Sequence, residues 1–368
     1  MGIRKFLRAV YGVLALALLG ACSPVAHKRI GATEPEIQDD LDRESLRLAV
    51  QQSLEFLAKI SGDRVLAERP RRVTAQDIKE SLLGFLEVID LWDRPEKMAE
   101  AIRFRFELVP SADDPAEKEV LVTGYYQPVI EGSLTQTGDY RFPVYRKPDN
   151  LVETFSRREI DVLGRLRGRG YEIAWMKDPV ELFFLHIQGS GIIRLEDGRT
   201  VQLNYAASNG RAYTSIGKIL ADEGKLAAEE LSAARLRRFL AEHPVEREAL
   251  FSRNERYVFF RFVESGPLGS LETLLTPGRS VATDPNYFPR GALALLTSRT
   301  PILDGAGNLA GWRPFSRFVL NQDAGAAIRG PTRLDLYFGS GALAGDAAGY
   351  MKSGGRLYFL LRKKSGAD

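Results

Sequence analysis

The length and composition of the chain exclude more than they identify. At 368 residues it is long for one compact core, which predicts two domains or one domain with a large insertion. The composition, 44% hydrophobic and 27% charged, excludes a disordered or fibrous protein. The net charge of +3 comes from Arg4, Lys5 and Arg8, because removing these three from the 51 basic residues leaves 48 against 48 acidic ones. The sequence therefore carries no basic nucleic-acid footprint.

The N-terminus has the pattern of an export signal. The three basic residues precede an apolar run of about 12 residues, well short of the roughly 20 that a membrane-spanning helix needs. The following Leu19-Gly20-Ala21-Cys22 resembles a bacterial lipobox, in which cleavage leaves the cysteine at the new N-terminus for acylation. Cys22 is the only cysteine and cannot form an internal disulfide. We predict a signal peptide over residues 1–21 and lipidation of Cys22; the alternative is an ordinary signal peptide with an incidental cysteine.

A tether and two scaffold helices are predicted next. Residues 22–44 carry few large apolar side chains and would hold the folded body away from a membrane. The first helix is expected over roughly Ser45 to Ile60. The second begins at Thr74, where Asp77 three residues later approximates a capping box, and its apolar residues share one face.

Strand patterns occur on both sides of a mixed segment. From Glu119 the sequence EVLVTGYYQPVIEGS alternates, with Gly124 and Pro128 closing a strand. The mixed segment contains a short helix capped by Ser156 and Glu159, a helix opened by Asp178-Pro179, a hairpin turn at Asp197-Gly198 and a polar helix near 226–242. Strands return in YVFFRFV, SLETLL, RSVATDP, ALALLTS, RFVLNQD, RLDLYFG and RLYFLLR.

This arrangement predicts a β domain that is interrupted by an insertion. We assign residues 45–125 and 251–368 to the β domain and residues 126–250 to the inserted domain. A cleft is expected where the two meet, because ligand sites concentrate between domains.

Several kinds of chemistry are poorly supported. The three histidines, His27, His186 and His243, have no metal-ligand spacing, so no metal site is predicted. His186 lies in ELFFLHIQGSG, where a packed imidazole is favoured over a catalytic one. The chain has no Gly-x-Ser-x-Gly elbow and no phosphate-binding glycine loop, and Gly189-Ser190-Gly191 is better interpreted as a helix end that turns tightly.

Three aspartates remain as candidates for chemistry, since Asp284, Asp323 and Asp335 each follow or lie within an apolar strand-like run. Partial desolvation raises the pKa of such a carboxyl group, which can then deliver a proton to a leaving oxygen near neutral pH. The alternative is a turn residue that hydrogen-bonds the local backbone, and this fits Asp284 better. For Asp323 the two interpretations stay balanced, because the chain after it carries no charge before Arg329.

An aspartic peptidase is a weaker interpretation of the same segment. Asp323-Ala324-Gly325 lacks the hydroxyl residue that follows the acid in those enzymes, and no second triplet of that kind is present.

Other residues suit a sugar polymer, because aromatic faces stack on sugars and amides or hydroxyls bond their polar groups. Tyr125 and Tyr126 are the best candidates, since adjacent strand residues point to opposite faces and one can face a cleft. The others are Tyr205, Tyr213, Trp175, Trp312, Gln188, Asn204, Asn209 and Ser215, each of which is also compatible with a place in the core.

Through these residues the chain resembles the membrane-bound lytic murein transglycosylase A family. Six motifs occur in the family's order over roughly residues 70–365. They are Thr123-Gly124-Tyr125-Tyr126-Gln127-Pro128; His186-Ile187-Gln188-Gly189-Ser190-Gly191; Asn209-Gly210 with Tyr213 and Ser215-Ile216-Gly217; Asn254 with Tyr257-Val258-Phe259-Phe260; Asp284-Pro285; and Gln322-Asp323 through Ile328-Arg329-Gly330 to Asp335-Leu336-Tyr337.

The resemblance implies a mainly β fold with some α structure. A double-psi β-barrel domain would be interrupted by a smaller β-rich domain, with a glycan groove between them. It also implies cleavage of the β-1,4 bond between N-acetylmuramic acid and N-acetylglucosamine, with formation of a 1,6-anhydro ring and without a metal or cofactor. One carboxylate is enough for this reaction if the C6 hydroxyl of the sugar replaces the water of a hydrolase.

The resemblance assigns the single catalytic acid to Asp323, as proton donor and then acceptor. Asp335 is expected to support it and Asp284 to be structural. The predicted substrate-binding residues are Thr123, Gly124, Tyr125, Tyr126, Gln188, Ser190, Asn209, Tyr213, Ser215 and Gln322.

The sequence departs from the family pattern at two places. Ala324-Gly325-Ala326 stands where Thr or Val and then Gly-Gly are usual, and Arg290 stands where an apolar residue is commoner. These departures concern the groove and the rate more than the class of reaction.

The expected partners are peptidoglycan glycan strands and, through the lipid on Cys22, a membrane. Ser23 does not carry the Asp that favours inner-membrane retention, so an outer-membrane lipoprotein facing the periplasm of a Gram-negative bacterium is expected. The alternatives are an inverting hydrolase that uses Asp323 and Asp335, and a peptidoglycan-binding lipoprotein without catalytic activity.

Overall fold

The computed structural model describes residues 35–68, 71–111, 119–149, 155–227 and 232–364. The predicted signal peptide, Cys22, His27 and the first part of the tether lie outside the described residues. Within them, no helix is both long and apolar enough to cross a membrane.

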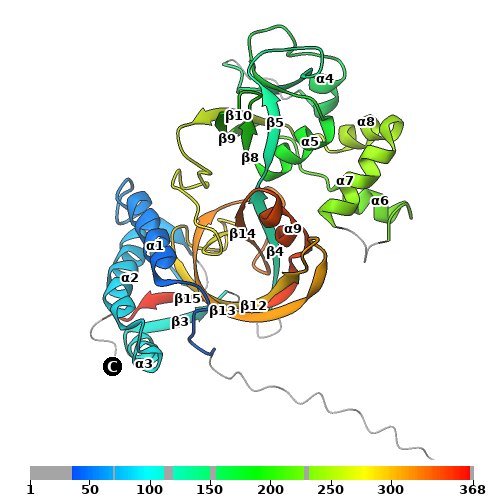
Figure 1. The fold of residues 1–368 in the computed structure, drawn as a ribbon. Coiled ribbons are helices and arrows are strands. Elements are labelled where there is room, and N and C mark those ends of the chain that lie inside the picture. Colours follow the sequence, from blue (N-terminus) through cyan, green and yellow to red (C-terminus); the bar gives the residue numbers. More distant parts are fainter. Residues whose placement is uncertain (1–34, 69–70, 112–118, 150–154, 228–231, 365–368) are drawn as a thin grey trace, which may run out of the picture. The chain divides into compact units, whose positions relative to one another are not determined.

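Six strands form a closed β-barrel (Figure 1). Their order is β12, β13, β11, β14, β4 and β15, and pairing of β15 with β12 closes the ring. Two neighbouring pairs are parallel, β13 with β11 and β14 with β4. A further strand, β3 (Phe106–Pro110), pairs with β15 beside the ring. The barrel strands are β4 (Val120–Gln127), β11 (Ser280–Ala282), β12 (Leu293–Leu303), β13 (Leu309–Asp323), β14 (Arg333–Ser340) and β15 (Lys352–Arg362).

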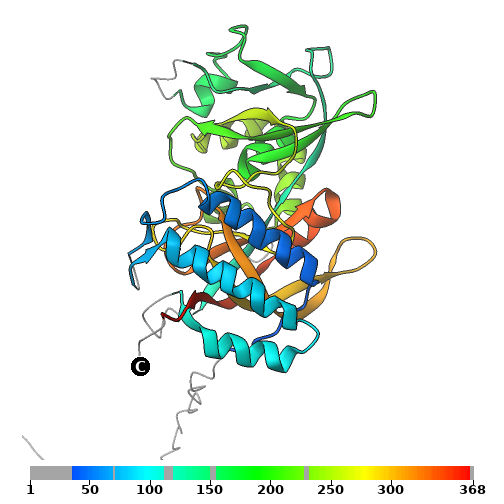
Figure 2. The same ribbon diagram turned by 90° about the vertical axis from the view of Figure 1, so that its left-hand side faces the viewer.

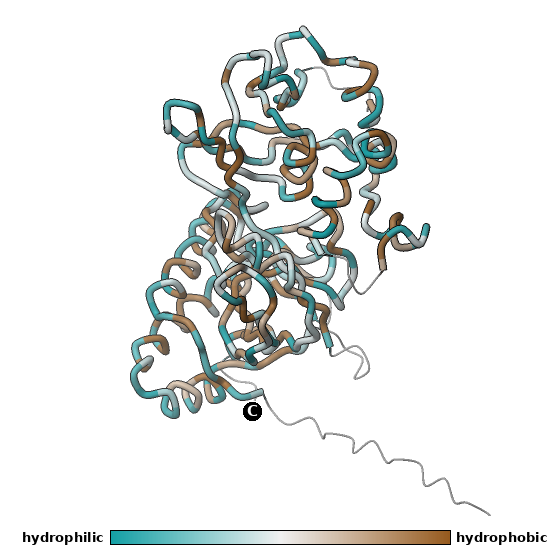
Figure 3. The backbone as a smooth tube through the Cα atoms, turned by 45° about the vertical axis from the view of Figure 1, so that its right-hand side comes forward, coloured by the Kyte–Doolittle hydropathy of each residue, from teal (hydrophilic) through white to brown (hydrophobic). Residues whose placement is uncertain are grey.

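Two helices lie side by side against the barrel (Figure 2). α1 (Arg43–Leu57) contacts β13 and α2 (Ala75–Val88) contacts β15. The predicted capping box of α2 is confirmed, because the Thr74 side chain accepts from the backbone of Asp77 and the Asp77 carboxylate accepts from that of Thr74. Apolar and polar residues alternate along these helices (Figure 3), so each buries one face in the core. The same part of the chain contains β1 (Val65–Ala67), β2 (Val73–Thr74), η1 (Ile89–Leu91) and α3 (Pro95–Arg105).

A second sheet of six strands has the order β10, β9, β8, β5, β7 and β6. The chain enters it directly from the barrel, because only Pro128 separates β4 from β5. Its strands are β5 (Val129–Ser133), β6 (Phe142–Tyr145), β7 (Glu172–Met176), β8 (Ser190–Arg194), β9 (Thr200–Ser208) and β10 (Val258–Val263). The helices of this part are α4 (Arg157–Asp161), α5 (Pro179–Gln188), α6 (Ile216–Asp222), α7 (Ala233–Glu242) and α8 (Pro244–Arg253).

Several local predictions in this part are confirmed. Ser156 and Glu159 form a capping box on α4. Asp178 caps α5, which has Pro179 in its first turn and ends at Gly189 with a φ of 79°. A residue with a Cβ is strained in that left-handed conformation, which explains the glycine at the helix end.

Other predictions differ from the structure. The segment Ser270–Leu275 is not a strand but a turning loop, in which Glu272 has a φ of 57° and its amide donates to the Gly269 carbonyl. The helix expected near 226–242 begins only at Ala233. β10, which the predicted boundary at residue 251 assigns to the barrel, pairs with β9 in the second sheet. The fold as a whole is mixed α and β rather than mainly β.

One further helix, α9 (Ala342–Tyr350), packs on β4 and β14. Gly124 makes this contact close: a Cβ there would lie 2.8 Å from the Ala348 Cα and 2.9 Å from the Phe338 ring. Gly124, predicted to bind substrate, is thus required where β4 meets α9.

Candidate active site

Neighbouring barrel strands place two of the three candidate aspartates in one row. Ala282 of β11 is paired with Asp323 of β13 on one side and with Asp335 of β14 on the other. Asp335 is in turn paired with Thr123 of β4. Neighbouring strands lie about 4.8 Å apart, so the Cα atoms of the two aspartates are about 10 Å apart. We call Asp323, Ala282, Asp335 and Thr123 the aspartate row.

Asp323 has an environment that favours its protonated form. Its Oδ1 accepts hydrogen bonds from the backbone amides of Ser270 (2.9 Å) and Ala324 (2.8 Å). Burial raises the pKa of Asp323 to about 6, although these two amides lower it, and the negative charge of Asp335 raises it further. A carboxyl group with this pKa is partly protonated near neutral pH and can act as an acid and, once ionised, as a base.

Two tyrosines lie beside this carboxylate. The rings of Tyr125 and Tyr337 are 5.2 Å apart between centroids. The Tyr125 hydroxyl is close enough to Asp323 to lower the pKa of that carboxyl, yet it is buried without forming a hydrogen bond of normal geometry to any described residue. Burial raises the pKa of both tyrosines, that of Tyr337 to about 12, so both stay protonated. Tyr125 thus offers a hydroxyl with unused hydrogen-bonding capacity at the site.

Asp335 is held by other residues of the barrel. Its Oδ1 accepts from the Thr123 hydroxyl and lies 4.0 Å from the Arg333 Nε. Burial raises the pKa of Asp335, while Thr123 and Arg333 lower it. A cation and a hydroxyl therefore support ionised Asp335, whereas Asp323 has two backbone amides and a tyrosine as its neighbours.

Two residues that sequence reasoning did not select reach the same site. Ser270, in the loop that replaces a predicted strand, bonds Asp323 through its backbone amide. Its carbonyl accepts from the Arg290 guanidinium at 2.6 Å. The Asp323 charge is close enough to affect the pKa of Arg290, which burial lowers. Arg290 was notable in sequence only as a departure from the family pattern, and Ser270 gave no signal because it acts through its backbone.

The side chain of Asp284 forms its hydrogen bonds with residues outside the aspartate row. Its Oδ1 accepts from the backbone and side chain of Asn286, and its Oδ2 accepts from the Gly330 amide at 2.9 Å. Asp284 is buried, and these bonds join the loop after β11 to the end of the segment that follows Asp323.

Some predicted substrate-binding side chains are fully occupied inside the protein. Gln322 is buried, donates to the Ala49 carbonyl and the Ser53 hydroxyl, and accepts from Ser280. Asn209 is also buried, and its amide bonds backbone groups of Phe155, Glu255 and Tyr257. Polar side chains bonded in this way position the backbone, and no part of them is left for a ligand in this conformation.

The two adjacent tyrosines point to different surroundings, as alternation predicts. Tyr125 faces Asp323, whereas the Tyr126 hydroxyl accepts from Arg237 at 2.7 Å. The Tyr126 backbone amide donates to the Gln188 side chain at 3.1 Å. Gln188, at the end of α5, thus fixes the strand that carries both tyrosines.

Three predicted residues from the second sheet and its helices are partly exposed. Tyr213 is close enough to Arg333 and Asp335 for their charges to affect its pKa, which burial raises. Ser215 caps α6 by accepting from the Lys218 amide, and Ser190 pairs with Asn204 in the sheet. Tyr213 is therefore the predicted residue that connects this part of the chain to the aspartate row.

His186 has a structural environment. It is buried against the Tyr257 ring, its Nδ1 lies 3.0 Å from the Arg157 guanidinium, and burial lowers its pKa well below the usual value. In the described part of the chain, no group of three or more His, Cys, Asp or Glu residues could hold a metal ion.

Comparison with known proteins identifies the family. Residues 121–261 match the MltA specific insert domain, and residues 279–361 match the 3D domain. The crystal structure of a membrane-bound lytic murein transglycosylase from Agrobacterium tumefaciens superposes with a TM-score of 0.73 at 30% identity, over 87% of this chain and 93% of that one. The chain belongs to the MltA family.

Other MltA proteins agree with this assignment. The membrane-bound lytic murein transglycosylase A of Escherichia coli is 35% identical over 244 residues, which are 66% of this chain and 65% of its own length. The aligned part thus spans about two thirds of that relative. The structure of E. coli MltA with bound chitohexaose superposes with a TM-score of 0.68 at 27% identity, over 86% of this chain and 90% of that one. The predicted family is therefore confirmed.

Proposed function

We propose that the protein is a lytic transglycosylase that cleaves peptidoglycan glycan strands. The bond broken would be the β-1,4 bond between N-acetylmuramic acid and N-acetylglucosamine, and the product a 1,6-anhydromuramic acid end. Membership of the MltA family supports this substrate class, and so does the chitohexaose bound to E. coli MltA. The observation that carries the proposal is the desolvated Asp323, whose pKa near 6 suits an acid that must later act as a base.

In the proposed reaction Asp323 begins protonated. It donates its proton to the glycosidic oxygen as the bond from C1 to that oxygen breaks, which leaves an oxocarbenium-like sugar. The C6 hydroxyl of the same sugar then attacks C1, and its proton passes to the Asp323 carboxylate. One carboxyl group thereby completes a cycle in which no water is consumed, unlike the two-carboxylate reactions of hydrolases.

Asp335 is assigned a supporting role. Its negative charge raises the pKa of Asp323, while Thr123 and Arg333 favour the ionised form of Asp335 itself. In the proposal it helps to keep the proton on Asp323 and stabilises positive charge on the sugar. Asp284 is assigned a structural role through its bonds to Asn286 and Gly330.

The proposed glycan groove lies between the barrel and the inserted domain. Tyr125 and Thr123 would contribute from the barrel, and Tyr213, Ser215 and Ser190 from the insert. The influence of Asp335 on the pKa of Tyr213 supports a site with residues from both sides. The buried Gln322 and Asn209 are assigned to positioning the backbone rather than to direct contact.

We also propose the domain plan of this site. The barrel is assigned double-psi topology, and its two parallel strand pairs are compatible with that. The insert is assigned to residues 126 to about 263, a boundary later than the predicted residue 250 because β10 pairs with β9. The tether is assigned to residues 22 to about 35, shorter than the predicted 22–44, because Asp39 and Asp40 pair with Arg279 and Arg317 of the folded body. It would join this body, through a lipid on Cys22, to the periplasmic face of an outer membrane.

The mass of the product tests the proposal. Purified sacculi are digested with the wild-type protein and with Asp323→Asn, and the muropeptides are analysed by mass spectrometry. We expect anhydro products, lighter than hydrolysis products by one water, from the wild type and none from Asp323→Asn. Reducing-end products from the wild type would instead support an inverting hydrolase using Asp323 and Asp335. No cleavage by the wild type would leave a peptidoglycan-binding lipoprotein.

A further inference from the structure

A pocket of about 180 Å³ lies within the inserted domain, and all its lining residues come from that domain. Its walls are apolar, formed by side chains such as Phe142, Leu182 and Phe251. This volume is small beside the roughly 300–1,000 Å³ of sites for drug-sized ligands, so it suits one or two amino-acid units. We call it the insert pocket.

The lining of the insert pocket includes a buried cation, Arg157, each of whose three nitrogens has a partner within the domain. Arg157 donates to the Asn254 and Arg256 carbonyls at 3.0 and 2.7 Å. Its remaining nitrogen lies 3.0 Å from the His186 ring and 3.4 Å from Asp161. Arg157 is 2% exposed, so its charge is satisfied within the protein and it fixes the position of Asp161.

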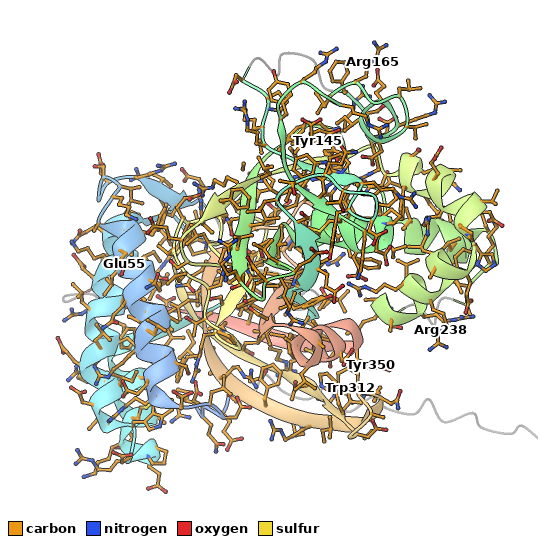
Figure 4. The ribbon with its side chains drawn as sticks, turned by 45° about the horizontal axis from the view of Figure 1, so that its top comes forward. Glu55, Tyr145, Arg165, Arg238, Trp312 and Tyr350 are labelled. Atoms are coloured by element: carbon orange, nitrogen blue, oxygen red, sulfur yellow. The ribbon has the colours of Figure 1, made fainter. Side chains whose placement is uncertain are left out.

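The mouth of the insert pocket carries charges of both signs. The Asp161 side chain is 34% exposed, and Glu248 of α8 is close enough for its charge to act on Asp161. Arg247, next to Glu248 on α8, and Arg167, beside the Tyr145 hydroxyl, supply positive charge. Tyr145 lies inside this domain, as Figure 4 shows.

We propose that the insert pocket binds the free end of a peptidoglycan stem peptide. The two carboxylates of the mouth would receive an amino group and the guanidinium groups a carboxylate. The apolar walls would take the hydrocarbon between them. This proposal rests on the proposed function, because stem peptides are attached to the muramic acid of the strand that Asp323 would cleave.

The chemistry of the lining favours this occupant over others. A sugar offers hydroxyls but neither an ammonium nor, in N-acetylglucosamine, a carboxylate. A stem peptide ends in short aliphatic residues and carries a free amine and free carboxylates close together. Charged groups of both signs around an apolar cavity match such a zwitterion, because each charge gains a partner as it leaves water.

Binding to the full protein tests the proposal. The probe is the tetrapeptide N-acetyl-L-Ala-γ-D-Glu-meso-diaminopimelate-D-Ala, whose L-Ala amine is blocked as it is in the strand, and its binding is measured by isothermal titration calorimetry. We expect binding by the wild type and a Kd about tenfold weaker for Arg247→Gln and for Glu248→Gln, since each loses one charge-assisted hydrogen bond. Both side chains lie at the surface of α8, so both variants should fold. Arg238→Gln is the matched control, because Arg238 lies on α7 outside the pocket lining (Figure 4).

Three outcomes would overturn the proposal: no tetrapeptide binding by the wild type, equal binding by both pocket variants, or binding of D-alanine as tight as that of the tetrapeptide, which would identify a free amino acid as the occupant. Cleavage of peptide-free glycan strands by the wild type separates this result from the proposed function. If the protein cleaves those strands but does not bind the tetrapeptide, the proposed activity stands and the proposed role of the insert pocket is wrong. If it binds the tetrapeptide but cleaves no strand, the role of the pocket stands and the proposed activity is wrong.

Discussion

The barrel and the inserted domain each contain an aspartate with a raised pKa, and the two aspartates have different neighbours. Burial raises the pKa of both Asp323 and Asp161. Asp161 lies against the buried Arg157, whose charge favours its ionised form. Asp323 accepts from two backbone amides and has the negative Asp335 nearby. A cation beside an acid favours its ionised form and a second anion favours its protonated form. Asp161 is therefore suited to holding a charge at the insert pocket, and Asp323 to the proposed exchange of a proton.

The largest expected effect is the loss of cleavage activity when Asp323 is replaced. Asp323→Asn should lose cleavage of sacculi by a factor of about 10²–10⁴, since an amide cannot exchange the proton of an acid and base. Muropeptide release measured by chromatography gives the rate. Asp139→Asn, at an exposed position, is the control and should keep the wild-type rate. Wild-type activity in Asp323→Asn would remove Asp323 from the mechanism.

In the inserted domain we expect the buried Arg157 to contribute to the free energy of unfolding. Arg157→Met removes a buried cation that donates to two backbone carbonyls and pairs with the partly exposed Asp161, so it should destabilise the protein by about 2–4 kcal/mol. Chemical denaturation followed by circular dichroism measures this. Arg165→Met, an exposed arginine of the same domain (Figure 4), should change stability little. A cost near zero for Arg157→Met would contradict the structural role of this cation.

The free energy of unfolding should depend on pH because the pKa of Asp323 is raised in the folded protein. Its folded pKa of about 6 exceeds the value near 4 of an unfolded aspartate, so the native state binds the proton more tightly and stability falls as pH rises from about 4 to 6. Asp323→Asn lacks this loss and should be more stable than the wild type by about 1–3 kcal/mol at pH 7. Below pH 4 the difference should shrink. Denaturation at several pH values measures it, and a constant difference would argue against a raised pKa.

The smallest effect concerns Tyr125. Its hydroxyl lowers the pKa of Asp323, so Tyr125→Phe should raise that pKa and move the alkaline limb of the kcat/KM profile upward by less than about one pH unit. Activity at the optimum should fall about tenfold or less, because one hydroxyl at the site is lost. Tyr126→Phe is the comparison, since Tyr126 faces Arg237. An unshifted limb in Tyr125→Phe would separate this tyrosine from the proton of Asp323.

Much of the local structure could be predicted from sequence, because the signals are local. The capping box of Thr74 and Asp77, and the end of α5 at Gly189, depend on residues within a few positions. The local sequence made Asp323 a candidate, since no nearby side chain neutralises it, but left it balanced between a catalytic acid and a turn residue, and only the family resemblance assigned it.

The rest of the site depends on contacts between distant segments. The amide of Ser270 reaches Asp323 across 53 positions, and its loop replaces a strand that the apolar pattern predicted. The amides of Gln322 and Asn209 were predicted to bind substrate, but their partners are backbone groups and serine hydroxyls that come together only in the fold. A polar residue in sequence does not say whether it faces a ligand or holds the chain, so these assignments required the structure.

The closure of the barrel has a consequence for the order of folding. Thr123 and Asp335, bonded to each other in the aspartate row, are 212 positions apart, and the whole inserted domain lies between them. Contacts of such long range form late, because the entropy of closing the intervening loop must be overcome first. The insert can build its own sheet earlier, because its paired strands are separated by shorter stretches of chain. If the chain is exported as proposed, it would therefore hold a finished insert and an incomplete aspartate row until nearly all of it has crossed the membrane, and the proposed lytic activity would begin only then.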